Sequence, residues 1–155
     1  MDVQTQELIE HLVRIHGEQG LSPRREDWQA LLSLPADSPV DMLNLLRFKA
    51  EVQTPAGVKT GFAAYGDYSK GVAGAFARVG GQLLYFGKMN WTFGTSDGGP
   101  WDAAILTRYP APRALADFWL DRASLGGRAP AEGRLARRIP HTRSKQAISH
   151  PWDHR

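Results

Sequence analysis

The sequence predicts one α+β domain built on an antiparallel sheet, for three reasons. Residues 40–50 are compact, apolar and bounded by turn signals, as a buried strand should be. Residues 80–94 and 100–110 have the pattern of two further strands, the first entered through a Gly-Gly turn. Residues 58–79 and 111–127 have the spacing of amphipathic helices and alternate with these strands, as is typical of an α+β fold.

Two amphipathic helices are predicted ahead of this core. The first, residues 5–20, carries its apolar side chains on one face and is stopped by glycines. The second, residues 22–35, begins with Ser22 as its N-cap and ends near Pro35. Neither helix can bury its apolar stripe alone. We therefore expect residues 1–38 to form an extension that docks on the core rather than a separate domain.

The predicted core helix at residues 58–79 brings its large apolar side chains onto one stripe: Phe62, Tyr65, Val72, Phe76 and Val79. We expect this stripe to lie on the sheet, although internal glycines weaken the helix by up to about 1 kcal/mol each relative to alanine. The two strands that follow are joined by residues 96–99, of sequence SDGG, as a hairpin link. Residues 134–148 are either a weak last strand or an extended arm.

The order of these elements from residue 40 is strand, helix, strand, strand, helix and, in the strand interpretation of residues 134–148, a final strand. This is the split βαβ pattern of a ferredoxin-like sheet, with four antiparallel strands and both helices on one face. We assign residues 39–148 to this domain and residues 149–155 to a tail. The other sheet face needs a cover, and a second copy of the same sheet is the simplest one, so a homodimer is expected.

The composition excludes several classes of protein. The chain of 155 residues has no cysteine, which excludes disulfides, thiolate nucleophiles and cysteine metal sites. It has no run of eighteen apolar residues, and its first residues lack the basic and apolar regions of a signal peptide. We therefore expect a cytoplasmic protein with no membrane partner.

The net charge of +3 is unevenly distributed, since residues 121–155 hold eight Lys and Arg against three Asp and Glu. Such a segment either contacts an acidic partner or nucleic acid, or forms a solvated tail. Aromatic residues are nearly absent from it, and no recognition-helix pattern accompanies it. Both observations argue against nucleic acid as a partner.

The sequence predicts no metal site and no cofactor. His11 and His16 are five residues apart on a helix, whereas a shared metal favours a spacing of four. His150, Asp153 and His154 fall near the end of the chain, where a solvated tail is the favoured interpretation. The sequence also lacks a nucleophile elbow, a P-loop and a dinucleotide fingerprint. Serine hydrolases, kinases and dehydrogenases are thereby set aside.

Four stretches of the chain follow one another in this order: DMLNLLRF, AAYGDY, GGQLLYFG and WDAAILTRYPAPRALADF. They resemble the family called domain of unknown function 1330, within the dimeric α+β barrel superfamily, over about residues 28–125. The resemblance implies a dimer and a ligand cavity between each sheet and its own helices. It implies no reaction, because related barrels include cofactor-independent monooxygenases, lactone isomerases, polyketide cyclases and haem proteins.

Candidate site residues lie on the first strand and the first core helix. Asn44 is the polar member of an otherwise apolar run, and a buried amide costs about 1–3 kcal/mol unless it is hydrogen-bonded. Its side chain is therefore either satisfied by backbone or aimed at a ligand. Tyr65 lies on the helical stripe and Tyr68 follows one turn later, so both hydroxyls reach one cavity or, alternatively, both rings only fill the core.

The strand at residues 100–110 supplies two charged candidates, Asp102 and Arg108. Alternation places them on one face with Ala104 and Leu106 between them. If this face lines the cavity, the planar fork of Arg108 suits a carboxylate, phenolate or enolate. If it faces the dimer partner, Asp102 and Arg108 pair across the two-fold axis.

Two classes of function fit this sequence. One is a cofactor-independent enzyme, of isomerase, cyclase or monooxygenase type, acting on a hydrophobic, enolisable or aromatic substrate. In it Asn44 and Arg108 stabilise an anion, and Tyr65, Tyr68 or Asp102 handles a proton. The other is a non-catalytic or stress-related homodimer that binds a small hydrophobic or anionic ligand in the same cavity.

Overall fold

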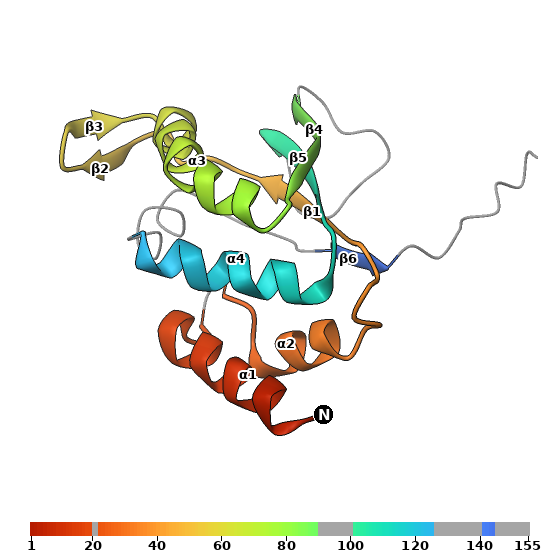
Figure 1. The fold of residues 1–155 in the computed structure, drawn as a ribbon. Coiled ribbons are helices and arrows are strands. Elements are labelled where there is room, and N and C mark those ends of the chain that lie inside the picture. Colours follow the sequence, from red (N-terminus) through yellow and green to blue (C-terminus); the bar gives the residue numbers. More distant parts are fainter. Residues whose placement is uncertain (20–21, 90–100, 126–140, 145–155) are drawn as a thin grey trace, which may run out of the picture.

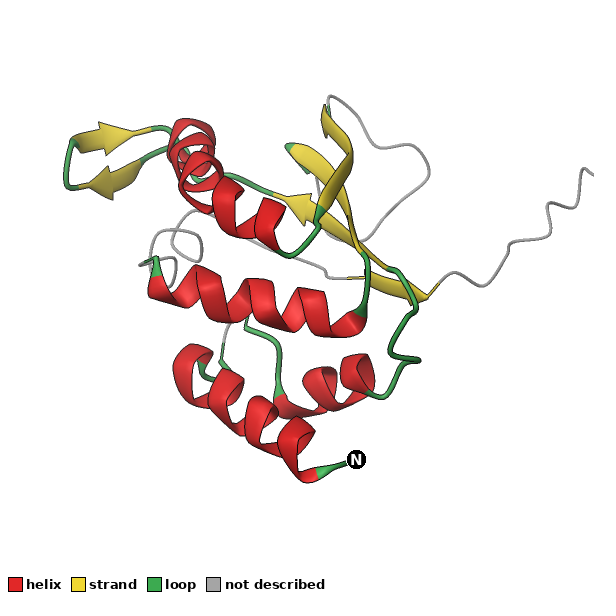
Figure 2. Ribbon diagram, in the orientation of Figure 1, coloured by secondary structure: helices red, strands yellow, loops and turns green. Residues whose placement is uncertain are grey.

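The computed structural model describes residues 1–19, 22–89, 101–125 and 141–144, and its core is one four-stranded antiparallel sheet (Figure 1). The strands lie in the order β4-β5-β1-β6. Their bounds are β1 Val40–Leu46, β4 Gln82–Lys88, β5 Ala103–Tyr109 and β6 His141–Ser144. Helices α3 (Gly61–Arg78) and α4 (Pro112–Ser124) pack on one face of the sheet (Figure 2). The predicted ferredoxin-like α+β fold is confirmed.

The two faces of the sheet follow from the alternation of side chains along β1 and β5. In β1 the even-numbered residues are buried and the odd-numbered ones are half-buried, whereas in β5 the odd-numbered residues are buried. The antiparallel register sets Met42 opposite Thr107 and Asn44 opposite Ile105. These buried positions form the helix-facing side, and the half-buried positions form the open face.

A short hairpin corrects the predicted start of the first core helix. Strands β2 (Val52–Thr54) and β3 (Gly57–Lys59) pair with each other, so Val58 belongs to a strand. The helix α3 begins at Gly61, because the Thr60 hydroxyl caps it by accepting from the Ala63 N–H at 3.2 Å. Only glycine fits at this first position, since a Cβ there would lie 2.5 Å from the Lys49 carbonyl oxygen.

The remaining boundaries differ in smaller ways from the prediction. Ser22 is not a helix N-cap: its hydroxyl donates to the His16 carbonyl at 3.0 Å, and the second helix begins at Arg25. Of the segment at residues 134–148, the described part pairs with β1 as the strand β6. The hairpin link assigned to residues 96–99 lies outside the described residues.

Helices α1 (Val3–His16) and α2 (Arg25–Leu32) pack against α4, on its side opposite α3 (Figure 1). The Trp28 ring meets the Trp119 ring edge-on, with centroids 5.4 Å apart. Trp28, Trp119 and Leu12 are each at most 2% exposed. The same hydrophobic cluster continues into the sheet through Val40, so the layers share one core.

Replacing Trp28 should test how strongly this layer is held. We expect Trp28→Ala to lower the free energy of unfolding by about 3–5 kcal/mol, because it removes a buried aromatic ring and leaves a cavity beside Trp119. Urea denaturation followed by circular dichroism measures the change. Val3→Ala is the control, since Val3 is 69% exposed on the neighbouring helix. Equal stability of the two variants would contradict the packing.

Candidate functional site

A cavity of about 480 Å³ lies between the helix-facing side of the sheet and the helices α3 and α4. Its size falls within the range of about 300–1,000 Å³ that is usual for small-molecule sites. Most of its wall is aliphatic or aromatic. The sheet contributes Met42, Asn44, Leu46, Leu83, Phe86, Ile105, Thr107 and Tyr109; the helices contribute Phe62, Tyr65, Gly66, Tyr68, Ser69, Val72, Ala73, Phe76, Phe118 and Arg122.

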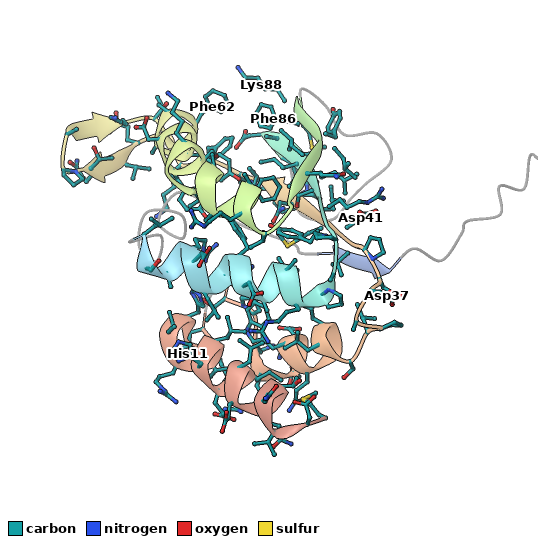
Figure 3. The ribbon with its side chains drawn as sticks, in the orientation of Figure 1. His11, Asp37, Asp41, Phe62, Phe86 and Lys88 are labelled. Carbon is teal, nitrogen blue, oxygen red and sulfur yellow. The ribbon has the colours of Figure 1, made fainter. Side chains whose placement is uncertain are left out.

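The mouth of the cavity lies between α3 and the edge strand β4. Phe62 from α3 and Phe86 from β4 both line the cavity, yet they are 43% and 47% exposed. Figure 3 shows these two rings near one another, with Lys88 beyond them. The Lys88 ammonium lies 4.8 Å from the centre of the Phe62 ring, within cation–π distance. The entrance therefore consists of exposed aromatic side chains.

Three of the five predicted site residues line this one cavity: Asn44, Tyr65 and Tyr68. Asn44 is 7% exposed and projects from the helix-facing side of β1. The rings of Tyr65 and Tyr68 are neighbours, with centroids 5.8 Å apart. Thr107, also on the wall, donates from its hydroxyl to the Met42 carbonyl at 3.4 Å.

An arginine that the sequence interpretation missed also lines the cavity. Arg122, near the C-terminal end of α4, is only 3% exposed. Its guanidinium carbon lies 3.8 Å from the centre of the Trp119 ring, which is a stacking distance. Its Nη1 donates to the Tyr68 hydroxyl at 3.4 Å. The guanidinium is thus held between an aromatic face and a wall tyrosine.

The sequence does contain a signal for Arg122. The buried stripe of α4 includes Leu115 and Phe118, and Arg122 follows at spacings of seven and four residues. A cation at a core position of an amphipathic helix is unusual, because Arg is almost never fully buried unless paired. Leu125, which follows the helix, is 53% exposed and does not belong to this stripe.

Arg108 lies outside the cavity, on the open face of the sheet. Its Nε and Nη2 donate to the two carboxylate oxygens of Asp41 at 2.6 and 2.7 Å, across the β1–β5 pair. This hydrogen bonding to a carboxylate raises the pKa of the Arg108 guanidinium above its ordinary value. In Figure 3, Asp41 lies well away from the cavity mouth marked by Phe62 and Phe86. Arg108 is therefore bound to a residue of its own chain instead of lining the cavity.

Asp102 also lies outside the cavity wall and instead joins three chain segments. Its carboxylate accepts from the Phe48 N–H at 2.5 Å, and its own N–H donates to the Leu46 carbonyl at 2.8 Å. Its carbonyl accepts from the Met89 N–H at 2.9 Å. These bonds tie the end of β1 and the end of β4 to the start of β5, which is a structural role.

Within the described residues, no group of three or more His, Asp or Glu side chains is placed to hold a metal ion. No helix in the described part of the chain is both long and apolar enough to cross a membrane. Apart from Arg122, the described wall residues best suited to proton transfer or to binding an anion are Asn44, Tyr65 and Tyr68. The arrangement suits an apolar ligand with a few polar groups.

Comparison with known proteins relates the chain by its fold alone. No family model matches it, and no curated protein matches it. The crystal structure of the RPA0582 protein of unknown function from Rhodopseudomonas palustris is similar, with a TM-score of 0.70, 20% identity, and coverage of 81% of this chain and 97% of that one. The methylated RPA0582 protein gives a TM-score of 0.73 and 19% identity, covering 84% and 97%. The chain therefore shares a fold with proteins whose function is unknown.

The contacts of Asp102 predict a scaffold role that mutation can test. Asp102→Ala should lower the free energy of unfolding by about 1 kcal/mol, because the Phe48 N–H loses its charged acceptor at an exposed position. Binding of a cavity ligand should be unchanged. Denaturant titration and a binding titration measure the two effects, with Asp37→Ala as an exposed acidic control. Weaker binding with unaltered stability would return Asp102 to the site.

Proposed function

We propose that this protein binds a hydrophobic small molecule in the cavity between its sheet and the helices α3 and α4. The observation that carries the proposal is an aromatic-walled cavity of about 480 Å³ whose mouth is lined by exposed apolar rings. An apolar ligand entering it removes its own surface and that of Phe62 and Phe86 from water. Asn44, Tyr65 and Tyr68 are the polar side chains of the wall that would orient the ligand in this proposal.

Catalysis in the same cavity is the second candidate, favoured by this same polar set. In such an enzyme Asn44 would donate to a developing enolate oxygen, and Tyr65 or Tyr68 would transfer a proton. Among the wall residues that the structure describes, none is Asp, Glu or His, the side chains that usually serve as general bases at neutral pH. Binding is therefore placed ahead of an isomerase, cyclase or monooxygenase reaction.

A homodimer formed through the open faces of two sheets belongs to this proposal. The open face carries apolar side chains in register: Leu43 opposite Leu106, and Leu45 opposite Ala104. Tyr85 of β4 adjoins Leu106 and is 54% exposed. A contiguous apolar patch of this kind marks an interaction site in soluble proteins. The same organisation supports membership of the domain of unknown function 1330 family, and a cytoplasmic location is part of the same proposal.

A neutral fluorescent probe tests the binding function directly. N-phenyl-1-naphthylamine, an apolar amine, should bind the protein and gain fluorescence on entering the cavity. Ala73→Trp should weaken this binding at least tenfold, because Ala73 lines the cavity at an exposed helix position where an indole would fill the space. Fluorescence titration gives both dissociation constants.

The matched control for this titration is Ala77→Trp. Ala77 is one turn further along α3, is exposed and is not part of the cavity wall. The second variant adds the same indole to the same helix, so the affinity should stay within twofold of the unsubstituted protein. Equal affinity of all three proteins, or no binding at all, would refute the proposed function.

The dimer is tested by the mass of the protein in solution. Light scattering at micromolar concentration should give about twice the chain mass of 17.2 kDa. Leu106→Arg should reduce it to the monomer, because it places a charge at the centre of the open face. Leu125→Arg, at an exposed end of α4, should leave the dimer intact. A mass of 17.2 kDa for the unsubstituted protein would rule out this dimer.

A further inference from the structure

Arg122 lies among mostly apolar side chains of the cavity wall. The side chain is 97% buried, being 3% exposed, and it forms part of the cavity wall. Arginine stays protonated in proteins, so this burial places a full positive charge beside the cavity. A buried charge is costly unless it is paired and hydrogen-bonded.

The described residues offer this charge no anionic partner. None of the ion pairs among them involves Arg122, although Arg108 and Arg113 each bind an aspartate. The Nε of Arg122 is buried and has no hydrogen-bond acceptor within the described part of the chain. Its one hydrogen bond there is the 3.4 Å contact from Nη1 to the neutral Tyr68 hydroxyl. Among the described residues, the guanidinium therefore keeps donor capacity that an incoming group would use.

The surroundings fix the orientation of Arg122. Its guanidinium carbon lies 3.8 Å from the centre of the Trp119 ring, and its Nη1 donates to the Tyr68 hydroxyl at 3.4 Å. Trp119 is in turn held edge-on by Trp28 and by His16, at centroid distances of 5.4 and 5.0 Å. The fork is thus set in place before any ligand arrives, which lowers the entropy lost on binding.

From these observations we infer that the cavity ligand is an amphipathic organic anion, whose acid group pairs with Arg122 and whose apolar body fills the aromatic space. This inference rests on the proposed binding function and names its ligand class. A planar guanidinium fork suits a carboxylate or a comparable oxyanion, with two parallel hydrogen bonds. Among the described wall residues Arg122 is the only cation, so a second acid group on the ligand would remain unpaired.

Two probes that share one apolar body separate charge from hydrophobicity. 8-Anilinonaphthalene-1-sulfonate is N-phenyl-1-naphthylamine with an added sulfonate. The protein should bind the anionic probe more tightly than the neutral one, although the sulfonate makes it more water-soluble. Arg122→Gln should lower the affinity for the anionic probe at least tenfold, equivalent to about 1.4 kcal/mol. The affinity for the neutral probe should stay within twofold of that of the unsubstituted protein.

Two more variants complete the design. Arg113→Gln removes an exposed arginine from the same helix and should change neither affinity. Arg122→Lys keeps the positive charge but loses the planar guanidinium fork. It should lower the affinity for the anionic probe by a smaller factor than Arg122→Gln does.

The outcomes distinguish this inference from the proposed function. Loss of anionic probe binding alone in Arg122→Gln supports an anion site. Equal changes for both probes, or none, would overturn the inference while the cavity remains a binding site. If Arg122→Gln does not fold, the affinities of the unsubstituted protein for the two probes provide the test. An affinity for the anionic probe that is no higher than for the neutral probe would contradict an anion site. If Ala73→Trp changes the affinity for neither probe, the proposed binding in the cavity is itself refuted.

Discussion

The packing of Trp119 connects all the layers of this structure. Its ring is met edge-on by Trp28 and His16 from the N-terminal helices, and Arg122 stacks on it. Its carbonyl oxygen lies 3.0 Å from His16 Nε2. Because α4 is buried on both sides, the N-terminal helices hold the same ring that orients the cavity arginine. The two-helix extension and the candidate site thus depend on one side chain.

The four-stranded sheet and its two covering helices could be predicted from the sequence because most of these elements show clear periodicity. The strands β1 and β5 are apolar runs in which alternation separates two faces, and the helix stripes of α3 and α4 have the expected spacing. The hairpin β2–β3 could not be predicted in this way, because its two strands of three residues are too short to show a period. Tertiary contact with Lys49, invisible in the pattern, sets the start of α3.

The candidate site was predictable only in part, since alternation separates faces without saying which one meets the helices. Asn44, Tyr65 and Tyr68 share the cavity because each lies on a stripe that is buried by the other layer. Asp102 lies before the start of β5, so strand alternation does not govern its side chain. The charge of Arg108 suits an anion, but the carboxylate that pairs with it belongs to Asp41, which is distant from it in sequence and opposite it in the sheet.

The exposed mouth along β4 has a kinetic consequence. The wall there consists of side chains on an edge strand and on a helix surface, with Phe62, Leu83 and Phe86 between 43% and 60% exposed. Exposed side chains change rotamer within picoseconds to nanoseconds, whereas opening of packed backbone takes microseconds or longer. Past the described wall residues, a ligand of the proposed kind would therefore exchange without unfolding or hinge motion of the sheet. Its residence time would then depend on the contacts it makes inside the cavity.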